Sequence, residues 1–128
     1  MIYDSTFLIA LERKRTRAAA INFLMRHLDE PARVPVIVLG ELAVGYSSLE
    51  ELRHNLDPAY IVEPLTEEIA WLASRVQETL ARQGRLIGEN DTWIAGFALY
   101  FHEPLISRDT DYASVVAAGF PLDWRHTW

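Results

Sequence analysis

Alternating strand and helix signals predict an α/β fold in which helices sandwich a mostly parallel central sheet. Two observations support this prediction: short β-rich segments recur along the chain, and stretches with helical spacing of apolar residues separate them. A third is that no repeat, low-complexity tract or Pro/Gly-rich linker divides the 128 residues. We therefore expect a single domain spanning residues 1–128.

The first half of the chain opens with a strand and a helix. A short apolar run over residues 1–3 ends at Asp4, and the apolar residues that follow have helical spacing over residues 5–13. The next predicted elements are a helix over residues 17–28, a short strand within 32–38, and helices over 39–46 and 49–56, the last ending near Pro58.

The second half begins with a short β-rich segment, residues 60–65, which predicts a strand. The longest helix should start after Thr66, a good N-cap, and stop at Gly84. Its first turn is acidic and its apolar stripe consists of Ile69, Leu72, Ala73, Val76 and Leu80. The remaining predicted elements are a helix over 91–101, a strand over 104–107 and a short helix over 111–119.

The composition narrows the function classes. A net charge of −6 argues against a protein that binds nucleic acid mainly through a broad basic surface. One local basic run, Arg13, Lys14, Arg15 and Arg17, is either a solvated helix end or an RNA contact. The absence of cysteine excludes disulfides, thiol nucleophiles and cysteine-ligated zinc. No apolar stretch reaches the roughly 18 residues of a membrane span and no signal peptide is recognisable, so we expect a cytoplasmic protein with no membrane contact.

Four acidic residues occupy special positions in this pattern. Asp4 directly follows one predicted strand and Asp109 closely follows another, and the carboxyl ends of parallel strands border the crevice where ligands bind. Glu41 and Asp91 lie near helix beginnings, and their helical neighbours three and four positions away are apolar or glycine. A carboxylate on an apolar face must find a partner, take up a proton or bind a cation.

Each acid also has an ordinary structural interpretation. Asp4 and Asp91 could cap helices, Asp109 could form a turn, and Glu41 could pair with an arginine. Together, however, four clustered acids would repel one another unless a cation held them. Their hard oxygen donors favour Mg²⁺, with Mn²⁺ as a possible substitute. The histidines are too scattered to suggest a zinc site: His27, His54, His102 and His126.

The four acids lie in four segments of the chain: "MIYDSTFLIAL", "VIVLGELAVGY", "IGENDTWIAGFAL" and "PLISRDTDY", which contain Asp4, Glu41, Asp91 and Asp109. In motifs, order and approximate spacing the whole chain resembles the PIN domain family, and within it the VapC-type ribonuclease toxins of toxin–antitoxin pairs. The Asn90–Asp91 pair followed by Trp-Ile-Ala is the most specific.

The chain departs from the family pattern in three places. Thr6 stands where members often have asparagine, and Gly96 stands where alanine is common. The usual Thr-Arg-Asp-x-Asp-Phe becomes the run from Ser107 to Tyr112. Asp111 in this run either shares a metal or only caps the following helix.

The resemblance implies metal-dependent endonucleolytic cleavage of RNA, with Asp4, Glu41, Asp91 and Asp109 as catalytic metal ligands. Ions held there would lower the pKa of a bound water and stabilise the departing 3′ oxygen, leaving a 5′ phosphate on the product. Side chains expected to orient the carboxylates are Thr6, Asn90 and Ser107. The resemblance also implies a cognate antitoxin whose tail presents an arginine to the acids.

A toxin homodimer is implied as well. The four tryptophans could supply an exposed aromatic patch for it, although Trp71 and Trp93 could equally be core side chains.

Two other function classes stay open. A receiver-like phospho-acceptor domain also gathers acids at the carboxyl ends of a parallel sheet, but it needs a late lysine, and the only lysine here is Lys14. A PIN-like module that binds RNA or protein without turnover would have the same fold, although it would have no reason to keep four acids on costly positions.

Overall fold

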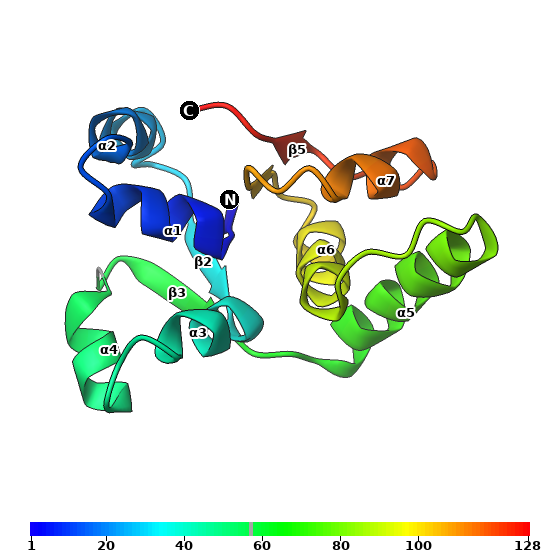
Figure 1. The fold of residues 1–128 in the computed structure, drawn as a ribbon, viewed down its shortest axis with the longest axis horizontal. Coiled ribbons are helices and arrows are strands. Elements are labelled where there is room, and N and C mark those ends of the chain that lie inside the picture. Colours follow the sequence, from blue (N-terminus) through cyan, green and yellow to red (C-terminus); the bar gives the residue numbers. More distant parts are fainter. Residues whose placement is uncertain (57) are drawn as a thin grey trace.

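A computed structural model describes residues 1–56 and 58–128. Its centre is a five-stranded sheet with the order β3-β2-β1-β4-β5, in which every neighbouring pair is parallel (Figure 1). The strands are β1 (Ile2–Tyr3), β2 (Ala32–Pro35), β3 (Tyr60–Glu63), β4 (Leu105–Ile106) and β5 (Trp124–Arg125). The helices are α1 (Ser5–Glu12), α2 (Arg17–Met25), α3 (Val36–Ala43), α4 (Leu49–Asn55), α5 (Glu67–Arg82), α6 (Glu89–Phe101) and α7 (Tyr112–Ala117). The predicted α/β class is confirmed.

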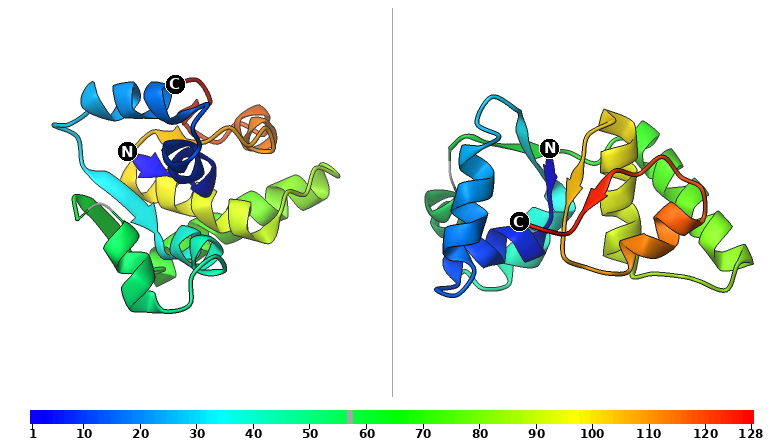
Figure 2. Two further views of the ribbon diagram at one scale, coloured as in Figure 1. Left: turned by 60° about the vertical axis from the view of Figure 1, so that its left-hand side comes forward. Right: turned by 90° about the horizontal axis from the view of Figure 1, so that it is seen from above.

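Helices cover both faces of the sheet, as predicted. Successive parallel strands are joined by right-handed crossovers, so the direction in which the chain moves along the sheet decides which face a helix covers. The chain moves one way from β1 to β3 and the other way from β3 to β4 and β5. Accordingly, α1 and α2 lie on one side of the strands, and α5, α6 and α7 lie on the other (Figure 2).

The change of direction places the switch point of the sheet between β1 and β4. These strands are hydrogen-bonded neighbours in the sheet, yet the connections that leave their carboxyl ends go to opposite sides. In open parallel sheets this switch point is the usual place for a ligand site. Residues directly after β1 and β4 are therefore placed side by side at the rim, although 103 positions separate Asp4 and Ser107 in sequence.

The longest helix follows its predicted signals. The Thr66 side chain accepts a hydrogen bond from the Ile69 backbone amide at 3.3 Å, and Gly84 ends the helical segment with a φ of 64°. The stripe of α5 packs against α6, where Gly96 permits close approach of the two backbones. A Cβ at Gly96 would lie 2.9 Å from the Ile69 carbonyl oxygen, so an alanine at this position would force the two helices apart.

Several element boundaries differ from the sequence expectation, and one strand was missed. β2 ends at Pro35 and the apolar residues 36–38 already belong to α3, because a buried apolar run fits a helix as well as a strand. α2 ends at Met25, short of the predicted residue 28, and α6 begins at Glu89, two residues before the predicted start. β5 was not predicted, since two residues are too few to give a strand pattern. Among the helices described, none has the length and apolar character that a membrane span requires.

Candidate active site

Asp4 lies at the switch point, directly after β1, with only 2% of its surface exposed. Its Oδ1 accepts a hydrogen bond from the Ser5 backbone amide at 2.7 Å, so it caps α1 as the ordinary interpretation expects. Its Oδ2 accepts hydrogen bonds from the hydroxyls of Ser107 at 2.5 Å and Thr6 at 3.4 Å. The carboxylate is thus both a cap and a fixed member of the rim.

Ser107 and Thr6 tie the ends of β1 and β4 together. Ser107 is fully buried, and its Oγ also accepts a hydrogen bond from the Asp109 backbone amide at 3.1 Å. The Thr6 Oγ1 accepts a hydrogen bond from the Arg108 backbone amide at 3.1 Å. Both side chains therefore hold Asp4 in place and anchor the loop that carries Asp109.

Glu41 reaches the same rim from α3. Its Oε2 accepts a hydrogen bond from the Ser5 hydroxyl, 3.3 Å away, and this serine also contacts Asp4. Its Oε1 is buried without a hydrogen-bond partner. Within residues 1–56 and 58–128, Glu41 forms no ion pair, so the expected alternative of an arginine partner is not observed. A buried carboxylate oxygen without a hydrogen-bond partner is costly, and a bound cation, a water or a proton would satisfy it.

Asp91 lies in the first turn of α6. Gly88 is the N-cap of this helix, so Asp91 is not the cap that the ordinary interpretation proposed. The Tyr112 hydroxyl donates a hydrogen bond to Asp91 Oδ1 at 3.2 Å, and Asp91 Oδ2 lies 3.0 Å from where a Gly88 Cβ would be. Gly88 thus leaves room for the carboxylate. The neighbouring Asn90 is exposed, and its side chain has no hydrogen bond to any described residue.

The loop after β4 adds two more acids. Carboxylate oxygens of Asp91, Asp109 and Asp111 lie within 4.8 Å of one another. Asp109 Oδ1 accepts a hydrogen bond from the Asp111 backbone amide at 2.9 Å, which is the predicted turn. Asp111 lies at the start of α7 but makes no capping hydrogen bond. Asp111 could therefore act as a further metal ligand together with Asp91 and Asp109.

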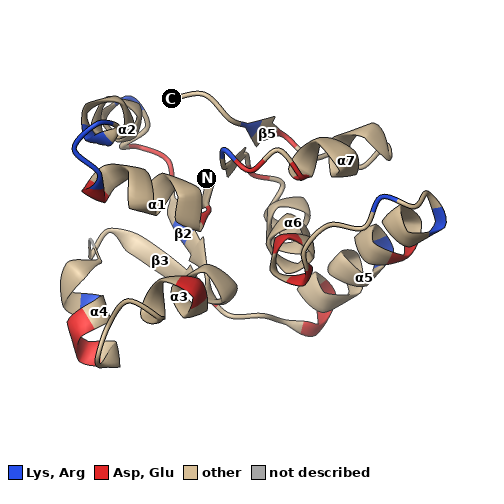
Figure 3. Cartoon of the chain, viewed as in Figure 1, with Lys and Arg blue, Asp and Glu red and all other residues tan. Residues whose placement is uncertain are grey.

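Electrostatic repulsion links the four predicted acids. Burial raises the pKa of Asp91 to about 6, and the charges of Asp109 and Asp4 add to the shift. Burial also raises the pKa of Glu41, and the charge of Asp4 raises it further. Burial raises the pKa of Asp4 as well, against the hydrogen bond from Ser107. These mutual charge effects show that the fold brings the four acids near one another. In Figure 3 acidic positions lie on α3, on α6 and next to the start of α7, besides others on α1, α4 and α5.

Two contributors were not predicted from the sequence. Ser5 bridges Asp4 and Glu41, and Tyr112 holds Asp91. Tyr112 did give a signal, because it replaces the phenylalanine usual in the family motif and so adds a hydroxyl. Ser5 gave none, since a serine at the start of a helix is unremarkable.

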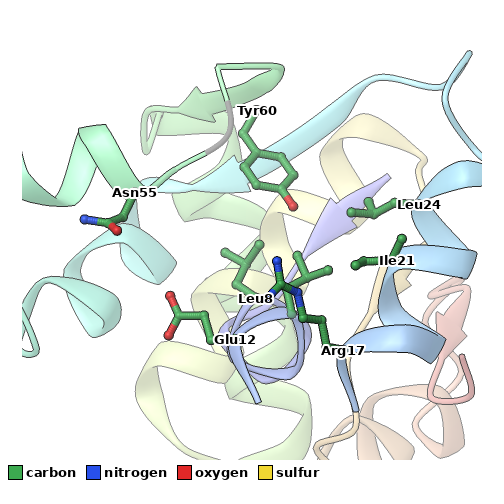
Figure 4. Close-up of a pocket in the computed structure, with 8 residues that line it drawn as sticks. Leu8, Glu12, Arg17, Ile21, Leu24, Asn55 and Tyr60 are labelled. Carbon is green, nitrogen blue, oxygen red and sulfur yellow. The ribbon is translucent and has the colours of Figure 1, made fainter. Parts of the chain in front are cut away.

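The four residues of the basic run do not all line the same cavity. All four of its side chains are exposed. Figure 3 shows the basic positions in blue along the loop between α1 and α2. Arg13 lines a cavity together with Thr6 and Arg108. Arg17 lines a different cavity of about 420 Å³, bordered by α1, α2 and Tyr60 (Figure 4). Only one end of the run thus faces the acidic rim.

The PIN domain profile matches residues 1–118. The chain belongs to the PIN domain family. It is also 33% identical over 106 residues to ribonuclease VapC5 of Mycobacterium tuberculosis, which covers 73% of this chain and 78% of the relative. These matches confirm the prediction that the chain is a VapC-type PIN protein and an enzyme of the nuclease class.

Solved structures of the PIN domain agree with this assignment. VapBC2 from Rickettsia felis, solved bound to a promoter DNA fragment, is 19% identical with a TM-score of 0.79 and 98% coverage of both chains. VapBC-1 from nontypeable Haemophilus influenzae is 27% identical with a TM-score of 0.74, covering 98% of this chain and 97% of its own. The first comparison supports the fold, and the second supports both the fold and the VapC-type relationship.

Proposed function

We propose that this PIN domain is a Mg²⁺-dependent endoribonuclease, acting in the cytoplasm as the toxin of a VapBC-type pair. The observation that carries the proposal is the convergence of four carboxylates from separate segments on one rim, with the buried Oε1 of Glu41 left without a partner. The relationship to a protein named ribonuclease VapC5 supports RNA as the substrate.

The residues present fit a hard divalent cation. Every candidate ligand is a carboxylate oxygen, which Mg²⁺ and Mn²⁺ prefer over softer donors. Carboxylate oxygens of Asp91, Asp109 and Asp111 lie close enough together to share a cation, and Asp4 and Glu41, whose charges act on Asp91 and on each other, would complete the site. A bound cation would neutralise the repulsion among the acids and supply Lewis-acid activation of water and of the scissile phosphate.

Hydrogen bonds from neighbouring side chains hold the acids in fixed orientations. The hydroxyls of Ser107 and Thr6 fix the orientation of Asp4, and the Tyr112 hydroxyl fixes Asp91. Such partners hold carboxylates in a productive geometry before the cation and the RNA arrive. Asn90 would join this set by turning toward Asp91 from its exposed position.

An antitoxin partner is part of the proposal. The solved relatives include a member of the VapBC family of toxin–antitoxin systems from Mycobacterium tuberculosis and a toxin–antitoxin complex from Klebsiella pneumoniae. An arginine from the antitoxin could neutralise the unpaired acids. The cavity in Figure 4 offers apolar walls from α1 and α2 for the same partner.

A homodimer is proposed on a different surface. Trp71 on α5 is 62% exposed, so the interpretation of this tryptophan as a core side chain is wrong, whereas Trp93 is half-buried. Leu65 is also exposed near the start of α5. An exposed aromatic and aliphatic patch of this kind is typical of protein interfaces.

The proposal is tested by incubating end-labelled structured and single-stranded RNAs with the purified protein and Mg²⁺, Mn²⁺ or EDTA. Cleavage should require a metal and should be lost in Asp91→Asn, which retains an acceptor for Tyr112. Metal-independent cutting, or full activity in the variant, would refute the mechanism. Calorimetry with Mn²⁺ distinguishes an inert binding module, which should take up no metal at millimolar concentration. Phosphorylation of Asp4 or Asp91 by a small phosphodonor would instead favour the receiver-like alternative. That alternative also needs a late lysine beside the phosphorylated acid, whereas the only lysine of the chain, Lys14, is exposed on the turn after α1.

A further inference from the structure

A second feature borders the acidic rim on the side of α1. A cavity of about 270 Å³ is lined by Thr6, Ile9, Ala10, Arg13, Thr16 and Arg108. Thr6 connects it to the rim, because its hydroxyl contacts Asp4 Oδ2 at 3.4 Å and accepts a hydrogen bond from the Arg108 backbone amide at 3.1 Å. The cavity therefore lies next to the proposed catalytic carboxylates.

The two arginines of this cavity have no acidic partner among residues 1–56 and 58–128. The Arg108 guanidinium is nevertheless positioned, because it lies 4.2 Å from the centre of the Trp128 ring and donates a hydrogen bond to the Trp128 carbonyl oxygen at 3.4 Å. Stacking leaves the remaining N–H donors of the guanidinium available.

The opposite wall is also held in place. The Arg13 backbone amide donates to the Ile9 carbonyl oxygen and closes the end of α1. The Thr16 hydroxyl donates to the Ala10 carbonyl oxygen at 2.8 Å and fixes the turn that follows. Two cations on ordered backbone thus face one cavity, whereas the exposed side chains of Lys14 and Arg15 do not line it.

This arrangement solves an electrostatic problem that the proposed reaction creates. The chain carries a net charge of −6, and the acidic rim repels the RNA backbone wherever a cation does not intervene. Guanidinium groups bind phosphate with paired N–H donors, and contacts of this kind set the register of a nucleic acid without reading its sequence. An anchor beside the acids would hold the chain of RNA while the scissile phosphate occupies the rim.

We propose that Arg13 and Arg108 form a subsite for a backbone phosphate of the RNA, adjacent to the phosphate that is cleaved. The proposal rests on the proposed ribonuclease function and extends it by assigning the step that positions the substrate. It selects Arg13 from the four basic residues of the run and adds Arg108, which belongs to the acidic motif after β4.

The test measures RNA binding separately from cleavage. Binding of a fluorescently labelled, mixed-sequence single-stranded RNA is followed by anisotropy in EDTA at low salt. Arg13→Glu and Arg108→Glu should each weaken binding by about 10-fold and should flatten the plot of log affinity against log salt by roughly 0.7 for each lost phosphate contact. Arg15→Glu is the matched control, because it makes the same charge change in the same run outside the cavity, and it should have little effect.

Several outcomes would overturn the subsite. Equal weakening by Arg15→Glu would mean a diffuse field, and no binding by the wild-type protein up to about 100 µM would mean that no anchor exists. Displacement of the RNA by poly-L-glutamate at equal charge would assign the cavity to an acidic peptide. Circular dichroism and thermal unfolding establish that the variants are folded.

Cleavage assays separate the subsite from the enzyme function. In Mg²⁺, the two cavity variants should raise KM for RNA and leave kcat nearly unchanged. If both variants cleave like the wild-type protein at low RNA concentration, the subsite is refuted and the nuclease stands. If no RNA is cleaved but the two variants selectively lose binding, the subsite stands and the nuclease assignment is refuted.

Discussion

Two groups of carboxylates lie at opposite ends of β1, and they differ in their hydrogen-bond and ion-pair partners. On the amino side, Glu103 accepts hydrogen bonds from the N-terminal ammonium of Met1 at 2.7 Å and from Arg33 at 2.8 Å, and Arg33 also pairs with Glu63. On the carboxyl side, Asp4 and Glu41 accept hydrogen bonds from hydroxyl groups, but no cation among the described residues pairs with them. Cations thus pair with the acids on the amino side, whereas no described cation pairs with Asp4 or Glu41.

The pKa values express this difference. Burial alone would raise the pKa of Glu103, but hydrogen bonds from the N-terminal ammonium and Arg33 bring it below its ordinary value. Burial raises the pKa of Asp91 to about 6, and its acidic neighbours reinforce the shift. Paired acids stabilise the fold, whereas unpaired acids at a ligand crevice cost stability and point to function.

The largest expected effect separates the two groups by activity. Asp4→Asn should lower RNA cleavage by at least about 100-fold, because it removes a carboxylate that supports the cation. Glu103→Gln should leave cleavage largely unchanged, since Glu103 belongs to the paired group on the other side of β1. Initial rates in Mg²⁺ check both variants, and a similar loss in the two would erase the functional distinction.

The next effect separates the groups by stability. Glu103→Ala should lower the free energy of unfolding by about 2 kcal/mol, because it leaves the ammonium of Met1, whose side-chain exposure is 1%, and Arg33 without their shared partner. Asp123→Ala is the control, since its ion pair with Arg125 is largely exposed and should contribute less than about 1 kcal/mol. Urea unfolding measures both changes. Equal losses would show that the paired group has no special structural role.

The smallest effect has the opposite sign. Asp91→Asn should stabilise the metal-free protein at pH 7 by about 1 kcal/mol, a value reduced for the solvent screening of a half-exposed group. The folded pKa of Asp91 is raised from 3.8 to about 6, so the folded state binds its proton more tightly, and stability falls as pH rises through this interval. The destabilisation is complete above about pH 6 and absent below 3.8.

Thermal unfolding in EDTA at pH 7 and pH 3.5 measures the difference between this variant and the wild-type protein. The gain in stability should vanish at the lower pH, where the aspartate is protonated in both states. Added Mg²⁺ should narrow the gap at pH 7 by stabilising the wild-type protein. A loss of stability in Asp91→Asn at pH 7 would mean that Asp91 is a structural acid like Glu103.

Much of the fold was predictable because its signals are local. The cap at Thr66, the stop at Gly84 and the apolar stripe of α5 depend on residues a few positions apart, so spacing alone locates them. Element boundaries at Pro35 and the two-residue strand β5 were not predictable, because packing against the sheet decides them.

The sequence by itself determined which acids are present, their order, and their association with strand ends and helix starts, and these sufficed to predict the family. Only the tertiary structure decided which groups meet them. The contacts of Ser107 with Asp4, Tyr112 with Asp91 and Glu103 with Met1 join positions 103, 21 and 102 residues apart. Such distances leave no periodic trace in a sequence, because it is the crossovers between parallel strands that bring these side chains within hydrogen-bonding range.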